Sequence, residues 1–179
     1  ILDIPALAKQ KILLLDGAMG TAIQSMRLPE EVFDGHAGCN EYLVLSVPEK
    51  IIEIHKSYFS AGSDIGETDT FGAIPLVLRE YGLESRTEEI NRRAAELLKK
   101  TALEFSTPER PRFTAGSIGP GTKLPSLGQI GFDEIFDGYR RQIEGLIDGG
   151  VDMLMIETCQ DLLQAKAALC AARHVMALT

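Results

Sequence analysis

The sequence is poor in aromatic residues and contains no long apolar run. Aromatic side chains make up 6% of the 179 residues, and tryptophan is absent. No apolar stretch reaches the roughly 18 to 20 residues that span a bilayer, and the N-terminus lacks the basic-then-apolar pattern of a signal peptide. Because 45% of the residues are apolar, the chain can still bury an ordinary core. We therefore expect one soluble, cytoplasmic domain or a large part of one.

Positive charge is also scarce. Lys and Arg number 18 against 26 Asp and Glu, which gives a formal net charge of -8. A chain with this balance lacks the basic surface that binds nucleic-acid phosphates or anionic lipids. The sequence therefore predicts neither a nucleic-acid partner nor a membrane partner.

Cysteine is rare and widely spaced. Cys39, Cys159 and Cys170 include no CxxC pair, so no disulfide framework is predicted and the thiols are expected to be reduced. His36 and Cys39 do have a spacing that can chelate a metal, and Cys159 lies two residues from Glu157. A zinc site within this chain is a minor alternative, and no residue is assigned to it.

Short apolar runs alternate with amphipathic helical patterns along the chain. The apolar runs predict four buried strands, at 12–15, 64–66, 112–115 and 153–156. Helical patterns follow them, with a capping box at 46–49, an N-cap at Thr87, and further helices at about 132–148 and 162–175. This order predicts an α/β fold with a parallel sheet and right-handed crossovers.

Four such units fit either a small doubly wound sheet or the first half of a (β/α)8 barrel. The barrel of the TIM type is favoured because polar groups follow every strand rather than a single switch point. The nucleotide-binding glycine motifs are also absent. Residues 24–45 have no clear period, and we expect them to cross the mouth of the fold as a long excursion.

Polar side chains stand where the predicted strands end. Asp16 opens the glycine-rich turn 16–21, whose backbone N–H groups can face a ligand. Glu67 and Thr68 follow the second strand, and Glu157 follows the fourth. Because the carboxyl ends of parallel strands meet at one edge, we expect these groups to share one site.

Taken together and in order, these motifs resemble the homocysteine S-methyltransferase family. They are LLLDGAMGT at 13–21, ETDTF at 67–71, AGSIGPG at 115–121 and GGVDMLMIET at 149–158, with AKAA downstream. The likeness is nearest to the cobalamin-dependent members, through TAIQSMRL and GCNEYLVLSVPEKI. The resemblance implies that residues 1–179 are the N-terminal half of a homocysteine-binding (β/α)8 domain.

The resemblance also implies an activity. The intact enzyme would transfer a methyl group, from methylcobalamin loaded by methyltetrahydrofolate, to the zinc-activated thiol of homocysteine, giving methionine. The folate and cobalamin would bind to other domains of the same polypeptide. The family's zinc ligands are three cysteines in the second half of the barrel, and no cysteine of this sequence matches them. The zinc ligands are therefore expected outside this chain, and the chain alone is expected to be inactive.

The resemblance assigns the substrate-binding residues as well. They are Asp16 with the backbone amides of Gly17, Ala18, Met19, Gly20 and Thr21, then Glu67, Thr68 and Thr70 on the second loop, and Glu157 at the substrate ammonium. The chemistry agrees, because a zwitterionic amino acid needs a carboxylate for its ammonium and N–H donors for its carboxylate. The alternative for Thr68 and Thr70 is that they bond only to loop backbone.

Two positions depart from the family pattern. Asp69 stands where the second loop usually has asparagine, so its charge would either repel a substrate carboxylate or lie outside the contact shell. Gly66 stands where a branched apolar residue is common, and we expect it to loosen the strand.

Two other functions stay open. One is a stand-alone homocysteine methyltransferase that uses a sulfonium or betaine donor. The other is a non-catalytic half barrel that binds or assembles, with possible dimerisation, since a half barrel exposes two sheet edges.

Overall fold

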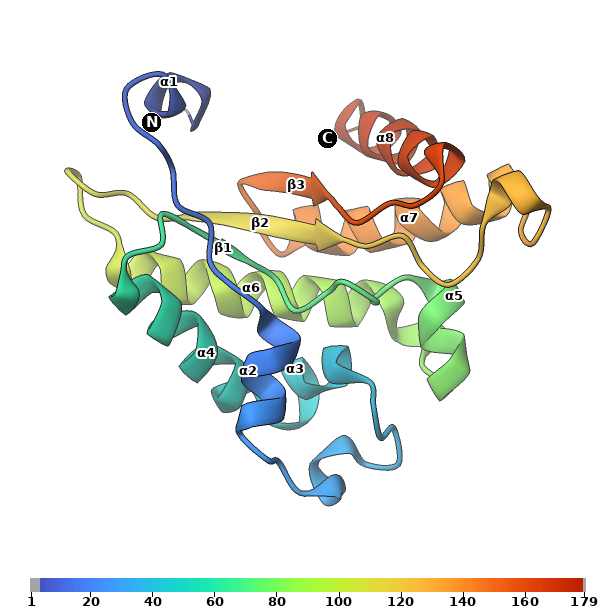
Figure 1. Ribbon diagram of the computed structural model, residues 1–179, viewed down its shortest axis with the longest axis horizontal. Helices are drawn as coiled ribbons and strands as arrows, with labels where there is room; N and C mark the ends of the chain where they lie inside the picture. The colour runs from blue at the N-terminus through green and yellow to red at the C-terminus, as the bar shows by residue number, and fades with distance from the viewer. Residues whose placement is uncertain (1–3, 179) are drawn as a thin grey trace.

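A parallel three-stranded sheet flanked by helices forms the centre of the chain (Figure 1). The computed structural model describes residues 4–178. Strands β1 (Ile65–Glu67), β2 (Phe113–Ile118) and β3 (Met153–Ile156) lie in the order β1-β2-β3, with both pairs parallel. No helix within residues 4–178 combines the length and apolar character that crossing a membrane requires.

All four predicted strand positions carry extended chain, but only three of them are strands. The fourth prediction has the bounds of β3, and the second and third overlap β1 and β2. The prediction of a full strand at 12–15 is wrong. Only Leu15 forms a bridge, to Ile65, while Ile12 is 86% exposed. Its backbone bonds to residues 64 and 65 come only from Leu14 and Asp16, so the ladder is too short to form a strand.

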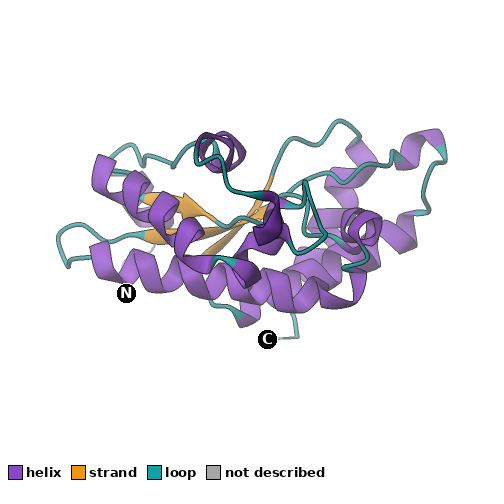
Figure 2. Cartoon of the chain, turned by 90° about the horizontal axis from the view of Figure 1, so that it is seen from below, coloured by secondary structure: helices purple, strands orange, loops and turns teal. Residues whose placement is uncertain are grey.

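Helices alternate with these strands, as the periodicity predicts. They are α1 (Ile4–Ala8), α2 (Met19–Ser25), α3 (Leu43–Ser46), α4 (Pro48–Ala61), α5 (Pro75–Leu78), α6 (Thr87–Phe105), α7 (Phe132–Asp148) and α8 (Leu162–Met176). Short 3-10 turns lie at Glu30–Phe33, Asn40–Tyr42, Arg79–Tyr81, Glu84–Arg86 and Pro125–Leu127. Figure 2, which views the chain from below, shows the strands at the centre with helices across them.

Two predicted helix caps are wrong. Ser46 ends α3, which runs directly into α4, so it is helical itself and Val47 is the N-cap of α4. An N-cap needs a non-helical backbone, and the Ser46 hydroxyl is buried without a partner. Thr87 is the first residue of α6, and its hydroxyl donates to the Glu84 carbonyl at 2.8 Å.

The sheet is covered on both faces. On the outer face, Ile118 and Leu154 pack with α7 and α8. On the inner face, Phe113, Ala115 and Met155 share a cluster that also includes residues of α1. Successive side chains of a strand point to opposite faces, so the inner face continues at the carboxyl ends with Glu67 after Ile65, Ser117 after Ala115 and Glu157 after Met155. The same alternation that builds the apolar floor therefore places polar groups above it.

Gly66 has a packing role rather than the loosening effect expected from its sequence. A Cβ at this position would lie 2.9 Å from both Leu98 Cδ1 and Phe59 Cζ, which is too close. Gly66 nonetheless keeps its register with Thr114 of β2. The missing side chain lets α4 and α6 pack directly against the strand.

Candidate functional site

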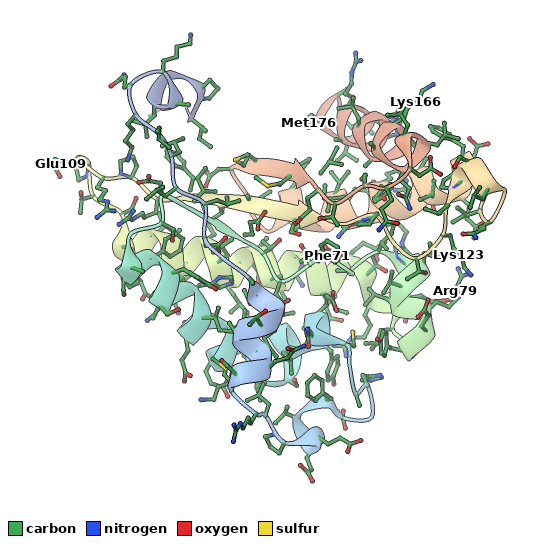
Figure 3. All side chains as sticks on the ribbon, in the orientation of Figure 1. Phe71, Arg79, Glu109, Lys123, Lys166 and Met176 are labelled. Carbon is green, nitrogen blue, oxygen red and sulfur yellow. The ribbon has the colours of Figure 1, made fainter. Side chains whose placement is uncertain are left out.

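A cavity of about 430 Å³ opens at the carboxyl end of the sheet. Figure 3 shows Phe71 and Lys123 toward this end, while Glu109, which precedes β2, lies at the opposite end. Five of the lining residues carry carboxyl groups, and no lining residue is Lys, Arg or His. The lining comprises Asp16, Gly17, Ala18, Met19, Gly20, Asn40, Glu41, Glu67, Thr68, Asp69, Phe71, Ser117 and Glu157.

Asp16 is held at the cavity floor by the chain that follows the Leu15 bridge. Its backbone N–H donates to the Ile65 carbonyl at 2.9 Å, and its Oδ2 accepts the Glu67 N–H at 3.0 Å. The other oxygen, Oδ1, is buried and has no hydrogen-bond partner among the described residues. Burial, together with the nearby charges of Glu67 and Glu157, raises the pKa of Asp16 to about 7.

Glu67 and Glu157 extend this acidic group across the inner face. Burial and the charge of Glu157 raise the pKa of Glu67, whose Oε1 is buried without a partner in the described chain. Glu157 Oε1 accepts the Ser117 hydroxyl at 2.6 Å. Thr158 then turns the chain with a positive φ of 56°, which is uncommon for a threonine. Three carboxyl groups without a cation between them form a site suited to a positively charged ligand.

The turn after Asp16 lines the same cavity with Gly17, Ala18, Met19 and Gly20. A Cβ on Gly17 would lie 2.9 Å from Tyr58 Cε1, so glycine lets this turn pass close to α4. Helix α2 begins at Met19, and its N-cap, Ala18, makes no side-chain capping bond. The first N–H groups of a helix have no intrahelical acceptor, which leaves donors for a ligand. Thr21 is not among the residues that line the cavity.

Thr68 and Thr70 belong to a hydrogen-bond network behind the cavity wall. Their hydroxyls are 2.6 Å apart, and the Thr70 hydroxyl donates to the Ser117 carbonyl at 2.8 Å. The Ser117 N–H in turn donates to Thr68 Oγ1 at 3.0 Å. Gln142 of α7 joins this network by donating to the Thr70 carbonyl at 2.8 Å. Thr68 lines the cavity, whereas Thr70 is fully buried and does not.

Sequence reasoning missed Asn40, Glu41, Phe71 and Ser117 as site residues. Asn40 and Glu41 lie in the 24–45 excursion, which has no periodicity that could place a side chain. Phe71 and Ser117 were visible only as members of the ETDTF and AGSIGPG motifs. The alternation along β2 offers a signal for Ser117, because it lies two residues after the inward-facing Ala115.

Asp69, noted from the sequence only as a departure, lines the cavity and does not lie outside it. Its side chain is buried, with 6% of its surface exposed. Burial and the charge of Glu41 raise its pKa well above the ordinary value. Glu41 Oε1 accepts the Gly72 N–H at 2.7 Å.

Metal ligands do not converge in the part of the chain that the structure describes. Residues 4–178 contain no group of three or more His, Cys, Asp or Glu side chains that could hold a metal ion. Cys39 is buried, and burial together with the charge of Glu41 raises its pKa to about 12, which disfavours the thiolate. His36 Nδ1 lies 2.9 Å from the Tyr81 carbonyl. These residues therefore do not fit a zinc site.

Comparisons with known proteins place the chain in one family. The sequence model of the family described as homocysteine S-methyltransferase matches residues 13–178. The chain is 40% identical to the methionine synthase of Mycobacterium tuberculosis over 97% of its own length, and 41% identical to that of Mycobacterium leprae over 93%. It spans only 15% and 14% of the length of these two relatives.

Solved structures give a matching fold. The metallated form of the Escherichia coli homocysteine methyltransferase MmuM matches with a TM-score of 0.78 at 23% identity, covering 96% of this chain and 62% of that one. The apo form of the same protein matches with a TM-score of 0.70 at 27% identity, covering 94% and 57%. At 23% identity, the first match is a likeness of fold alone.

Proposed function

Because the chain belongs to the homocysteine S-methyltransferase family, we propose that it forms the amino-acid-binding part of an enzyme that methylates the thiol of homocysteine. The product would be methionine, as the names of the mycobacterial relatives suggest. The observation that carries the proposal is the cavity at the carboxyl end of the sheet, where carboxyl groups gather without a cation among the lining residues. Such a site attracts the ammonium group of an amino acid.

In this proposal each end of the substrate has its own partners. Asp16, Glu67 and Glu157 surround the ammonium group, which compensates for their mutual repulsion and burial. The N–H groups of the turn from Gly17 to Gly20 receive the carboxylate, and Thr21, which does not line the cavity, is left out of this contact. Thr68 forms part of the wall, and Thr70 acts behind it by fixing the Ser117 backbone.

We further propose that residues 1–179 form the N-terminal half of a (β/α)8 barrel. The parallel sheet with alternating helices supports this, as does the coverage of 62% of the MmuM structure. An apolar groove of about 490 Å³ along β3, lined by residues such as Ile147, Leu154 and Leu169, offers a surface on which the sheet could continue.

The methyl donor and the metal are proposals carried by the resemblance alone. Methylcobalamin and methyltetrahydrofolate would bind to other domains of the polypeptide, and a sulfonium or betaine donor is the alternative. Zinc would lower the pKa of the substrate thiol. Since residues 4–178 do not fit a zinc site, the ligands would come from outside this chain, and no step of the reaction is assigned to its own cysteines.

The test is zinc content and homocysteine binding, measured on the 179-residue chain and on a chain extended through the rest of the barrel. We expect stoichiometric zinc and homocysteine binding only in the longer chain. If the shorter chain binds both, the ligands must come from its own cysteines and histidines, and the proposed division of the site is wrong. If neither chain binds homocysteine, the proposed function itself fails.

A second candidate is an assembly module, favoured by one observation. Ile12 is 86% exposed and Leu14 is 56% exposed, and both lie beside β1 at the edge opposite the β3 groove. Two apolar edges of this kind promote self-association. Light scattering on the 179-residue chain decides this point, because a monomer at high concentration would contradict the assembly function.

A further inference from the structure

The carboxyl groups of the cavity form two sets. Asp16 follows the Leu15 bridge, Glu67 ends β1 and Glu157 follows β3, and the proposed function uses all three for an ammonium group. Asp69 and Glu41 form the second set, on the loop after β1 and on the 3-10 turn at Asn40–Tyr42. The proposed function leaves this second set without a role.

Asp69 is a buried polar group that lacks a partner. Only 6% of the side chain is exposed, and its Oδ2 atom is buried with no hydrogen bond among the described residues. The residue nevertheless lines the cavity, and its other oxygen, Oδ1, is not enclosed in this way, so a ligand can reach that oxygen. A buried polar group normally has a hydrogen-bond partner, and a ligand in the cavity can supply one.

Glu41 adds a second acid beside the buried Asp69. Its Oε1 accepts the Gly72 N–H at 2.7 Å, which fixes its carboxylate against the loop that carries Asp69. Neither acid forms an ion pair with any residue in the described part of the chain. A buried carboxyl group that lies beside another acid and has no cation favours its neutral form. Asp69 is buried whereas Glu41 is only half-buried, so Asp69 is the member that keeps its proton.

We propose that Asp69 faces the cavity as a neutral carboxylic acid and donates its O–H to the carboxylate of the amino-acid substrate. The proton stays on Asp69, so the contact is a hydrogen bond and involves no transfer. This inference rests on the proposed function, because it names the residue that recognises the second charged end of the same substrate.

The charge of the cavity is the reason why the carboxylate needs such a donor. An anion entering a cavity lined by five carboxyl groups is repelled unless some of them are neutral. The Ser117 hydroxyl is already used by Glu157, and the Thr68 hydroxyl by Thr70. Among the lining side chains that the proposed function does not use, Asn40 and a protonated Asp69 remain as donors, and they add to the backbone N–H groups of the turn at 17–20. A protonated carboxyl group also has the donor that an asparagine amide would offer at this position.

The experiment compares two variants and two ligands in the full-length protein by isothermal titration calorimetry. The Asp69→Asn variant keeps a neutral donor of the same shape, and Asp69→Ala removes it. The ligands are homocysteine and 3-aminopropanethiol, which is homocysteine without its carboxylate. Hydrogen bonds to charged groups correspond to about 10- to 100-fold in affinity.

We expect Asp69→Asn to bind homocysteine within about twofold of the unmodified protein, and Asp69→Ala to bind it at least about tenfold more weakly. For 3-aminopropanethiol, Asp69→Ala should bind as well as the unmodified protein. Tighter homocysteine binding by Asp69→Ala would mean that Asp69 is a repelling anion and would overturn the inference. An equal loss for both ligands would overturn it too, because the contact would then not involve the carboxylate.

A second measurement does not depend on the alanine variant folding. The infrared difference spectrum between the unmodified protein and Asp69→Asn should contain the carbonyl stretch of a protonated carboxyl group at neutral pH, and the band should shift when homocysteine binds. A carboxylate band in its place would overturn the inference. If the unmodified protein binds no homocysteine at all, the proposed function fails, and the infrared band still decides the protonation of Asp69.

Discussion

The two ends of the sheet treat buried acids in opposite ways. At the amino end, Asp64 is 3% exposed and is surrounded by donors: Lys11 Nζ at 2.8 Å, Arg112 Nη1 at 3.5 Å and the Leu14 N–H at 3.1 Å. Burial by itself would raise the pKa of Asp64, but the bond from Lys11 and the other donors outweigh it and lower the pKa. At the carboxyl end, Asp16 has no cationic neighbour, and its pKa rises to about 7.

This difference separates stability from function within one sheet. A paired acid such as Asp64 stabilises the fold that contains it. Acids without a cationic partner, such as Asp16 and Glu67, destabilise the fold, and in the proposed function a bound ammonium group supplies that partner. Mutations at the two ends should therefore change different observables.

The largest effect is expected at the amino end. Asp64→Asn leaves Arg112 buried without its charged partner, so the free energy of unfolding should fall by about 3 kcal/mol. Urea unfolding of the domain, followed by circular dichroism, measures this. Asp16→Asn is the matched control, and it should leave stability unchanged or raise it. If the control lost as much stability as Asp64→Asn, the contrast between the two ends would disappear.

The next effect belongs to the carboxyl end. Glu157→Gln keeps the shape of the side chain but removes the charge proposed to face the ammonium group. Homocysteine affinity in the full-length protein should weaken by about 1–3 kcal/mol, with stability little changed. Calorimetric titration provides the value. An unchanged affinity would remove Glu157 from the substrate contacts.

The protonation of Asp16 gives a pH dependence of intermediate size. Its pKa is about 7 in the folded chain and 3.8 in the reference state, so the empty protein should lose stability as the pH rises from about 4 to about 7. An ammonium group favours the ionised acid, so homocysteine affinity should rise with pH up to about 7, by at most about tenfold per unit. Titrations at several pH values measure this slope. In Asp16→Asn the slope should be smaller, and the part that remains should come from Glu67, whose pKa is also raised.

The smallest effect is expected from Ser117, which acts through another residue. Its hydroxyl holds Glu157 Oε1 at 2.6 Å, so Ser117→Ala should weaken homocysteine binding by about 1 kcal/mol. In a background that already carries Glu157→Gln, the same substitution should cost much less, because the charge-assisted bond is gone. Equal losses in both backgrounds would mean that Ser117 does not act by positioning Glu157.

The sequence predicted the strands and helices that carry the acids, but not the side-chain contacts between distant residues. The strand at 153–156 and the long helices follow from apolar periodicity, which is a local signal. The sequence also predicted that Asp16, Glu67 and Glu157 lie at one edge of the sheet, because the carboxyl ends of parallel strands lie together. The prediction of a strand at 12–15 failed because only its last residues pair with residues 64 and 65, and apolar character does not reveal how far such pairing extends.

Side-chain partners far apart in the chain could not be predicted. Lys11 and Arg112 both reach Asp64, from positions 53 and 48 residues away, and no periodicity encodes such a meeting. Glu41 enters the cavity from a segment without any pattern. The Ser46 cap failed for a local reason, because α3 already includes Ser46 and runs directly into α4.

The ring of acids around the cavity has a practical consequence for anyone who handles the protein. A pocket lined by five carboxyl groups and no basic side chain attracts small cations from the buffer. Amine buffers such as Tris carry the same charged group as an amino acid and will compete for the same oxygens. Binding constants measured in such buffers will underestimate the affinity, and a buffer without an amine avoids the competition.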